Sequence, residues 1–339
     1  MLSKKALSAS LGRRGAIALA MAAVVTTSVG GCGLLGGDDS SSSSGGSGNL
    51  EKSKIKVATM STIDTASLRL AQDGGYFKTE GLDVELVEAA TGQISLTKLI
   101  GSEVDIAYAS YTPFFIAMSK GTADIKLVSD ASSAGPKSTA IIAMPTSSVR
   151  GINDLAGKKI GIFAPNTVSD TLTKSVMKDH GVDFSKVQWV PVQPPNMAAA
   201  LKNGDIDAGF LTEPFITQAA KQAGTVPIVD TATGATQDFP TAGYGALGKF
   251  TTENPKTVAA FQRAMQKATR DAADRSKIEP LLVKYAKIDQ DTAALTTLLT
   301  FQSTLDPRRI QRVPDLLLQM GAIQTKIDVG PMIAAQTTS

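Results

Sequence analysis

The sequence contains an internal repeat, and this repeat restricts the possible folds more than any other feature. The segment LIGSEVDIAYA, residues 99–109, aligns with LKNGDIDAGFL, residues 201–211, at a constant offset of 102. A Pro-Phe pair follows each segment, at Pro113-Phe114 and at Pro214-Phe215. Similar units in the same order predict a chain built from two related halves.

Strand and helix signals alternate in both halves, which is typical of an α/β protein with mostly parallel sheets. The expected strands are residues 54–60, 82–87, 104–109, 125–130 and 140–144 in the first half and residues 158–163, 187–192 and 206–211 in the second. Loops that follow parallel strands gather at one edge of the sheet. Two such sheets facing each other predict a two-lobed clamp with a cleft between the lobes.

After Tyr244 the pattern becomes helical, and the dipeptide Asn254-Pro255 is a typical helix start. Further helices are expected at residues 278–286, 291–305 and 313–321, packed on the first lobe. The predicted division is therefore residues 54–143 and 245–339 for lobe 1, and residues 144–244 for lobe 2. The chain would then cross between the lobes twice, near residues 143–148 and 241–247.

The N-terminal segment has the composition of an export signal. Its basic head carries two lysines and two arginines, an uncharged apolar run covers residues 16–25, and small residues precede Cys32. Ten apolar residues are too few to span a bilayer, which takes about 20. We therefore expect residues 1–31 to be a signal peptide. Residues 32–53 form a Gly- and Ser-rich flexible tether in this interpretation.

Cys32 is the only cysteine of the chain. The string VGGC, residues 29–32, resembles the lipobox of bacterial lipoproteins, whose cysteine becomes the lipidated N-terminus. The resemblance implies a lipid anchor on Cys32 and a location at the extracytoplasmic face of the cell membrane. A free thiol beside an ordinary cleavage site is the alternative. Arg13-Arg14 is also similar to a twin-arginine signal, so the export route stays open.

The charge of the chain argues against a nucleic-acid partner. The 34 basic and 31 acidic residues give a formal charge of +3, and removal of the signal takes away four basic residues and no acidic one, which leaves −1. A near-neutral body without a basic cluster does not attract phosphates. Cys32 and His180, the only residues of their kinds, cannot build a Cys/His metal site. We expect no cofactor, no metal and a monomer.

Four segments resemble one family. They are GGYFKTEGLDVEL (residues 74–86), GSEVDIAYASYTPF (101–114), GINDLAGKKIGI (151–162) and GDIDAGFLTEPF (204–215). They are similar to segments of the substrate-binding lipoproteins of ABC importers for nitrate, sulfonates, taurine and thiamine-precursor pyrimidines. The resemblance implies a type II periplasmic-binding-protein clamp with two hinge crossings. It also implies capture of a small polar organic molecule, sulfonate/taurine-like or pyrimidine-like, and its delivery to an ABC permease with a separate ATPase.

In such a clamp the ligand contacts loops at strand C-termini and helix N-termini. Five loops occupy these places: residues 61–65, 91–93, 110–112, 166–169 and 212–213. The candidate ligand-binding residues are Ser61, Thr62, Asp64, Thr65, Gln93, Ser110, Tyr111, Thr112, Asn166, Thr167, Ser169, Glu213 and Tyr244. Helix capping is an alternative role for hydroxyls such as that of Ser169. A structural role is an alternative for Glu213.

The five loops contain no Lys or Arg. Asp64, Asp170 and Glu213 would oppose a second negative charge, so a dianion that needs a bidentate arginine is disfavoured. The hypothesis is a neutral, zwitterionic or aminated ligand. A pyrimidine or an amino-sulfonate fits this hypothesis and nitrate does not.

The sequence leaves two other functions open. An extracytoplasmic sensor domain could use the same clamp to signal to a membrane receptor. A pyrimidine synthase of the thiamine pathway shares the fold implied by the resemblance, but it uses a histidine and a cysteine-rich motif. Here His180 lies at a predicted helix end and Cys32 lies in the leader, so we do not expect an enzyme.

Overall fold

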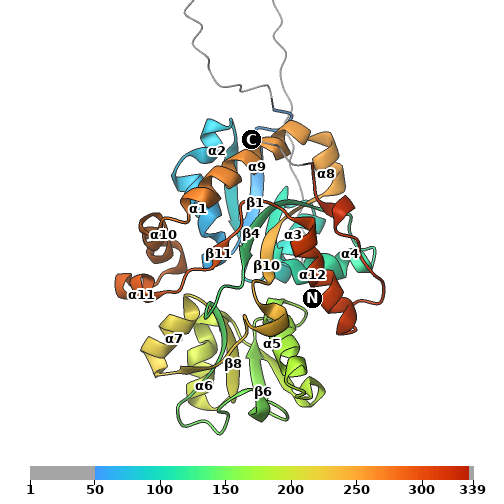
Figure 1. Ribbon diagram of the computed structural model, residues 1–339. Coiled ribbons are helices and arrows are strands. Elements are labelled where there is room, and N and C mark those ends of the chain that lie inside the picture. The colour runs from blue at the N-terminus through green and yellow to red at the C-terminus, as the bar shows by residue number, and fades with distance from the viewer. Residues whose placement is uncertain (1–49, 336–339) are drawn as a thin grey trace, which may run out of the picture. The chain divides into compact units, whose positions relative to one another are not determined.

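The computed structural model describes residues 50–335 (Figure 1), which belong to one compact unit, Gly46–Ser339. The expected signal peptide, Cys32 and most of the tether lie outside the described residues. Within residues 50–335, the helices are all too short or too polar to span a bilayer.

The first lobe is built on a six-stranded mixed sheet with the order β11-β4-β10-β3-β1-β2. Strands β2, β1 and β3 are mutually parallel, whereas β10 is antiparallel to β3 and β4, and β11 is antiparallel to β4. The strands are β1 (Lys54–Thr59), β2 (Asp83–Glu88), β3 (Ile106–Ser110), β4 (Ile125–Ser133), β10 (Pro240–Leu247) and β11 (Thr300–Phe301).

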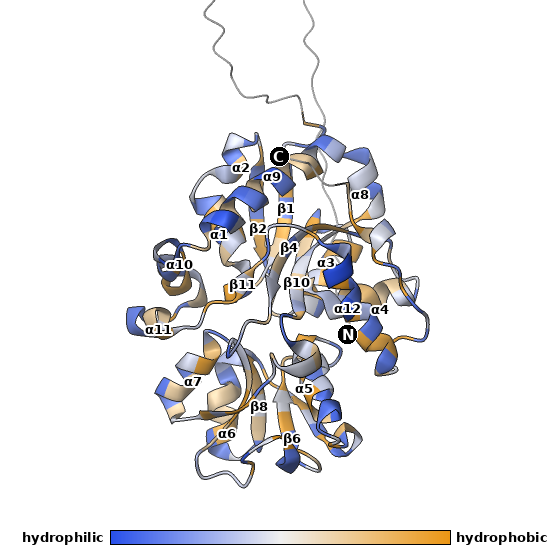
Figure 2. Ribbon diagram, in the orientation of Figure 1, coloured by the Kyte–Doolittle hydropathy of each residue, from blue (hydrophilic) through white to orange (hydrophobic). Residues whose placement is uncertain are grey.

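Helices cover both faces of this sheet, and each face has its own apolar core. The helices are α1 (Ala66–Asp73), α2 (Tyr76–Thr79), α3 (Gly92–Ile100), α4 (Tyr111–Ser119), α8 (Gly248–Glu253), α9 (Pro255–Asp271), α10 (Arg275–Leu281), α11 (Gln290–Leu295) and α12 (Pro307–Gln319). Helices α1, α9 and α10 pack on one face, and α3, α4 and α12 pack on the other. In Figure 2 the strands are predominantly hydrophobic and the flanking helices carry the polar residues, as burial of both sheet faces requires.

The second lobe has a five-stranded sheet with the order β7-β6-β8-β5-β9. Its elements are β5 (Thr139–Ala143), β6 (Lys159–Ile162), β7 (Gln188–Pro191), β8 (Ala208–Thr212), β9 (Val226–Asp230), α5 (Val168–Asp179), α6 (Met197–Asn203) and α7 (Phe215–Ala223). Helix α6 packs closely on the sheet because β6 and β8 carry glycines where the helix crosses them. A Cβ atom at Gly161 or Gly209 would lie 2.5 Å from the sulfur of Met197. These two glycines therefore allow the close approach.

The two sheets have the same strand order, which confirms the repeat seen in the sequence. Strands β2-β1-β3-β10-β4 of lobe 1 correspond to β7-β6-β8-β5-β9 of lobe 2. In each lobe the fourth strand of this series is antiparallel to its neighbours. That strand follows the chain crossing in both lobes, and it makes each of the mostly parallel sheets a mixed one.

The positions of β5 and β10 differ from the predicted lobe boundaries. Thr139–Ala143 was expected in lobe 1 but pairs with β8 and β9 in the second sheet. Residues 240–244, expected in lobe 2, begin β10 in the first sheet. The chain therefore crosses between β4 and β5 and returns between β9 and β10, several residues earlier than predicted each time. An isolated apolar strand does not reveal which sheet it will join.

The helix predicted at residues 291–305 forms only over its first residues. Helix α11 ends at Leu295, and Thr300–Phe301 pairs with β4 as strand β11. The Arg275 guanidinium donates hydrogen bonds to carbonyls at the end of this helix, at 2.7 Å to Ala293 O and 2.9 Å to Thr296 O. The β-branched residues Thr296, Thr297 and Thr300 favour extended backbone over helix.

Candidate functional site

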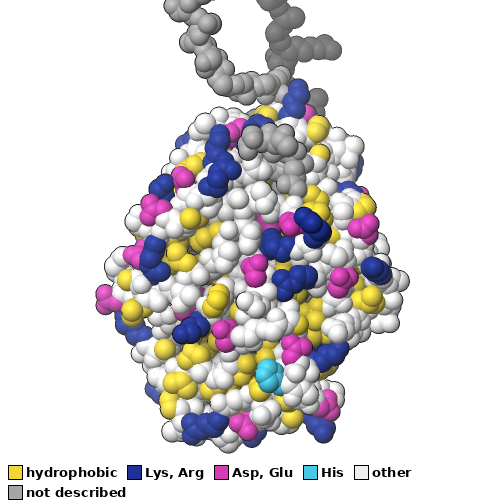
Figure 3. Space-filling view, viewed as in Figure 1, with side chains coloured by type: hydrophobic (Ala, Val, Ile, Leu, Met, Phe, Trp, Pro, Cys, Tyr) yellow, Lys and Arg dark blue, Asp and Glu magenta, His cyan; other side chains and the backbone are white. Residues whose placement is uncertain are grey.

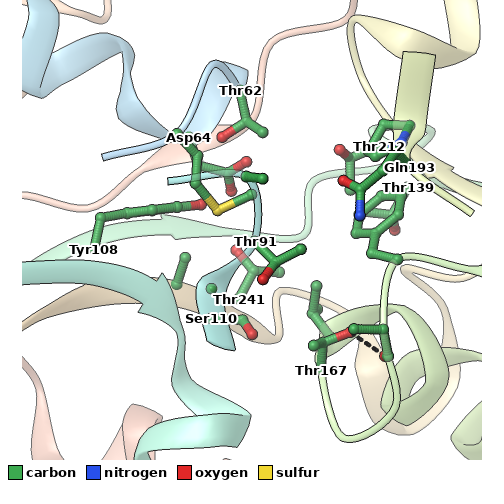
Figure 4. Close-up of a pocket in the computed structure, with 18 of the residues that line it drawn as sticks. Thr62, Asp64, Thr91, Tyr108, Ser110, Thr139, Thr167, Gln193, Thr212 and Thr241 are labelled. Atoms are coloured by element: carbon green, nitrogen blue, oxygen red, sulfur yellow. Dashed lines mark hydrogen bonds between the residues drawn. The ribbon is translucent and has the colours of Figure 1, made fainter. Parts of the chain in front are cut away.

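A cavity that is partly open to solvent lies between the two lobes. Its walls are the ends of strands and the loops that follow them, the position expected for a ligand site in an α/β clamp. It is lined by Met60, Thr62, Asp64, Ala90, Thr91, Gly92, Tyr108, Ser110, Thr241, Ala242 and Leu299 from lobe 1, and by Thr139, Phe163, Ala164, Thr167, Val168, Gln193, Pro194 and Thr212 from lobe 2. Figure 4 shows these side chains facing a common space.

Asp64 is the one charged residue in this lining. It lies in the turn Ile63–Thr65 between β1 and α1, and it is only 7% exposed. The Ser132 hydroxyl donates to Asp64 Oδ1 at 2.6 Å, and Thr241 Oγ1 lies 2.8 Å from the Ser132 hydroxyl oxygen. Burial raises the pKa of Asp64, although hydrogen bonds from Ser132 and other neighbours oppose the rise. Among residues 50–335, the hydrogen-bond partners of this carboxylate are neutral groups.

Two hydroxyl groups accompany Asp64 on this wall. Burial and the negative charge of Asp64 raise the pKa of Tyr108 well above its ordinary value. The Thr62 hydroxyl lies near both residues, but it makes no hydrogen bond of normal geometry within the described chain. Buried polar groups are nearly always paired in folded proteins. An unpaired hydroxyl beside a buried carboxylate is therefore positioned to bind a polar ligand atom.

Lobe 2 supplies uncharged polar groups to the opposite wall. Figure 4 shows Gln193, Thr212 and Thr139 on the side facing Asp64 and Tyr108. Thr139 Oγ1 already accepts a hydrogen bond from the Thr231 hydroxyl at 2.8 Å. The Thr167 hydroxyl donates to Ala164 O at 2.9 Å, which fixes the loop before α5. An amide and several hydroxyls can both donate and accept hydrogen bonds.

The structure places four of the thirteen candidate residues in the cavity lining, namely Thr62, Asp64, Ser110 and Thr167. Ser61 is exposed and lies 3.4 Å from Glu88 Oε2, whereas the buried Thr65 hydroxyl donates to Met60 O at 2.8 Å. Gln93 Nε2 lies 3.5 Å from Pro165 O of the other lobe. These three residues surround the cavity without lining it.

Two further candidates face a different space. Thr112 and Asn166 line a separate groove between α5 and the end of α12. The Ser169 hydroxyl accepts from Phe163 N at 3.1 Å and so holds its own loop, whereas the N-cap of α5 is Thr167. Glu213 accepts hydrogen bonds from the amide and hydroxyl of Thr217, at 3.1 and 2.8 Å. Burial raises the pKa of Glu213, and its role in the described structure is to hold the start of α7.

The tyrosines Tyr111 and Tyr244 were expected at the cavity wall and lie outside its lining. Both are fully buried, and the Tyr111 hydroxyl donates to Asp130 Oδ1 at 2.9 Å. Tyr244 pairs across the sheet with Tyr108. Because β10 runs antiparallel to β3, the start of β10 meets the cleft, so Thr241 and Ala242 reach the cavity instead of Tyr244.

The expectations from sequence missed several lining residues: Met60, Tyr108, Thr139, Phe163, Gln193, Thr241 and Leu299. Gln193 follows the end of strand β7, so the rule that selected the five loops could have found it. Thr139 and Thr241 lie at the starts of antiparallel strands and do not follow that rule.

The cavity lining formed by the described residues contains no Lys or Arg. Helix N-termini present free amides that can attract an anion, and the starts of α3 and α5 both reach the lining, at Gly92 and Val168. At the start of α3, the Thr91 hydroxyl accepts from Ile94 N at 3.2 Å. The start of α5 also has partners of its own. Here the Asp170 carboxylate already accepts from Thr167 N at 2.8 Å and from Asn166 N at 3.1 Å. Lys174 Nζ pairs with the same carboxylate at 2.8 Å. The two amides that precede this helix are therefore paired within the protein.

Comparisons with known proteins agree with this architecture. The sequence model of the family described as "NMT1/THI5 like" matches residues 62–277. A Bacillus subtilis protein named for binding aliphatic sulfonates is 25% identical over 280 residues, which are 78% of this chain and 82% of that protein. A 4-amino-5-hydroxymethyl-2-methylpyrimidine phosphate synthase of Saccharomyces cerevisiae is 31% identical over 216 residues, 59% of this chain and 61% of the synthase.

The periplasmic aliphatic sulphonate binding protein of Escherichia coli has a similar solved structure. Its TM-score is 0.68 at 19% sequence identity, and the match covers 84% of this chain and 98% of that one. At this identity the structural likeness establishes the fold, which is the two-lobed α/β fold of periplasmic binding proteins. The family match covers more than half of the chain. The chain belongs to the NMT1/THI5 like family.

Proposed function

We propose that this protein is an extracytoplasmic solute-binding protein that captures a small polar organic molecule between its lobes and delivers it to an ABC permease. The observation that carries the proposal is the cavity lined from both lobes, with one buried carboxylate and no basic side chain. The Bacillus subtilis relative named for sulfonate binding supports a binding role. Attachment through a lipid on Cys32, after removal of residues 1–31, remains part of the proposal.

The chemistry of Asp64 suggests what part of the ligand lobe 1 holds. A buried carboxylate without a cation gains most from a partner that is positively charged or rich in N–H donors. An ammonium group or an aminopyrimidine meets this requirement, and nitrate does not. The uncharged groups Gln193, Thr212 and Thr139 would contact the rest of the ligand.

Binding by closure requires that the ligand contact both lobes only when they are closed. Shifting the open and closed populations from 1:99 to 99:1 takes about 5.5 kcal/mol of differential affinity. Several hydrogen bonds supplied by lobe 2, each worth about 0.5–1.5 kcal/mol net, together with apolar contacts to Phe163, can provide this energy.

The synthase relative raises catalysis as a second candidate function. His180, the only histidine in the sequence, lies at the end of α5, and its Nδ1 is 2.9 Å from Val176 O. It does not belong to the cavity lining. The residues present therefore favour binding over the histidine-dependent chemistry considered from the sequence.

The test is native mass spectrometry of the full chain purified from its own organism, with release and identification of any bound small molecule. We expect an unmodified, nitrogen-containing solute in one-to-one ratio with the protein. Recovery of a chemically altered product after incubation with that solute would support the catalytic alternative. Recovery of nitrate, or of a solute with no N–H group, would contradict the proposed role of Asp64.

A further inference from the structure

The C-terminal region touches both lobes through a short segment that we call the bridge segment, residues 287–299. It follows the π-helical turn Leu282–Ala286, contains α11 and ends just before β11. The sequence suggested only that this region packs on lobe 1. Figure 1 shows α11 extending from lobe 1 toward α7 of lobe 2, and these two helices are in contact.

The bridge segment is anchored in lobe 1. Arg275, at the start of α10, donates hydrogen bonds to the carbonyls of Ala293, Ala294 and Thr296. Ala293 and Leu299 belong to the core of lobe 1. Strand β11 follows directly and pairs with β4. The bridge segment is therefore fixed to lobe 1 by three guanidinium hydrogen bonds, buried apolar contacts and a strand pairing.

The bridge segment also makes polar contacts with lobe 2. Lys221 Nζ of α7 lies 2.6 Å from Asp289 Oδ1 and 3.9 Å from an Asp291 oxygen. The Thr297 amide lies 3.4 Å from Glu213 Oε1. The Lys221 pair is solvent-exposed, with side chains 47% and 56% accessible. Exposed ion pairs are weak and are screened by salt.

The opposite side of the cleft differs. There the lobes share a continuous apolar core, which includes Leu172 and Phe210 of lobe 2 together with residues of α4 and α12. Separating an apolar core exposes surface to water, whereas an exposed ion pair can separate at small cost. The side that carries the bridge segment is therefore the side at which the cleft opens.

Leu299, at the end of the bridge segment, also lines the cavity. We propose that the bridge segment is a third, non-covalent connection between the lobes, and that it gates the cavity through the Lys221–Asp289 pair and the Glu213–Thr297 contact. The structural part of this proposal is independent of ligand identity. Only the statement that the gate controls solute entry rests on the proposed function.

The first test is hydrogen–deuterium exchange of the full chain without added ligand, comparing Lys221→Ala with Lys277→Ala. Lys277 makes a 3.0 Å pair with Asp271 of similar exposure, but that pair lies wholly within lobe 1. We expect Lys221→Ala to speed exchange in peptides covering residues 288–299 and 213–217 by about two- to fivefold, the change expected for loss of one exposed ion pair. The control should leave both peptides unchanged. Equal behaviour of the two variants, or a change confined to residues 288–299, would overturn the proposal.

A second measurement reports on the gate itself. In a Leu299→Cys background, alkylation of the introduced thiol, mapped by mass spectrometry, measures how often the cavity opens. Adding Lys221→Ala should raise this rate by about two- to fivefold at low salt, and 1 M salt should largely remove the difference. Asp289→Asn should act in the same direction because it removes the charge and keeps an N-cap acceptor for Thr292. An unchanged alkylation rate in both variants would refute gating. Because no solute is used, this outcome is distinct from failure of the proposed function.

Discussion

The loops that follow β1 and β6 occupy corresponding places in the two lobes, yet the acidic residue next to each loop has different hydrogen-bond partners. In lobe 2, the Asp170 carboxylate accepts hydrogen bonds from the amides of Asn166 and Thr167 in the preceding loop, and it forms an ion pair with Lys174. In lobe 1, Asp64 faces the cavity, and its closest hydrogen-bond donor is the uncharged Ser132 hydroxyl.

The difference indicates that the two loops have different roles. The loop of lobe 2 has used its polar groups to fix α5, so it offers a stable surface. The loop of lobe 1 leaves a buried carboxylate without a charged partner and the Thr62 hydroxyl without a well-formed hydrogen bond among the described residues. This arrangement costs stability, but both groups are available for a ligand. Recognition would then depend mainly on lobe 1, with closure supplied by lobe 2.

The largest expected effect comes from Asp64→Asn. The substitution keeps the size of the side chain and removes the negative charge that would pair with an ammonium or aminopyrimidine group. A hydrogen bond to a charged group is worth about 1.5–3 kcal/mol, so affinity for the solute that co-purifies with the protein should fall about 10- to 100-fold. Calorimetric titration measures this, with Asp170→Asn as the matched control that should bind nearly as the wild type does. Equal losses in the two variants would remove the distinction between the loops.

Asp170→Ala should affect stability instead. It removes the acceptor of two backbone amides and the partner of Lys174 at the start of α5. Loss of such a cap costs about 0.5–2 kcal/mol of unfolding free energy. Urea unfolding followed by circular dichroism gives the value. If Asp170→Ala unfolds at the wild-type urea concentration, the capping role assigned to this loop is incorrect.

Asp64 should also make stability depend on pH. Its pKa is raised above the ordinary value of 3.8, so the folded protein retains this proton at pH values where the unfolded chain has released it. The unfolding free energy contributed by this group therefore falls as pH rises from 3.8 through the raised pKa. Urea midpoints of wild type and Asp64→Asn should be similar below this window, and the variant should become relatively more stable above it. A difference that does not vary with pH would contradict burial of an unpaired carboxylate.

Thr62→Val should have the smallest effect on folding. The Thr62 hydroxyl makes no well-formed hydrogen bond in the described chain, so replacing it with a methyl group should change the unfolding free energy by no more than about 0.5 kcal/mol. Solute affinity should nevertheless weaken, because a donor and acceptor beside Asp64 is lost. A large loss of stability would show that this hydroxyl is needed for the fold itself.

The repeat could be predicted because short sequence segments of each half carry the residues that form the same local contacts. In both halves an aspartate just before the third strand holds the start of the first strand. Asp105 Oδ2 accepts from Lys56 N at 2.9 Å, and Asp207 Oδ2 accepts from Lys159 N at 2.8 Å. These are the aspartates that align in the two sequence segments. The fold and the strand ends near the cavity followed from such local patterns.

The parts that could not be predicted depend on contacts between distant segments. Strands β5 and β10 each join the sheet of the other half, and nothing in their apolar sequences specifies this. The same exchange brings Thr139 and Thr241 to the cavity and keeps Tyr244 away from it. Leu299 reaches the cavity only because Arg275 and β4 fix the bridge segment, contacts that span many residues of sequence.

The most direct test uses taurine and ethanesulfonate, two probes that differ by one amino group, and an aminopyrimidine as a third probe. Calorimetric titration measures the affinity of each probe for the wild type and for Asp64→Asn. We predict that taurine or the aminopyrimidine binds the wild type, that ethanesulfonate and nitrate bind much more weakly, and that Asp64→Asn loses the preference for the amino group. Tight binding of ethanesulfonate or nitrate to the wild type, unaffected by Asp64→Asn, would contradict the central role of this carboxylate.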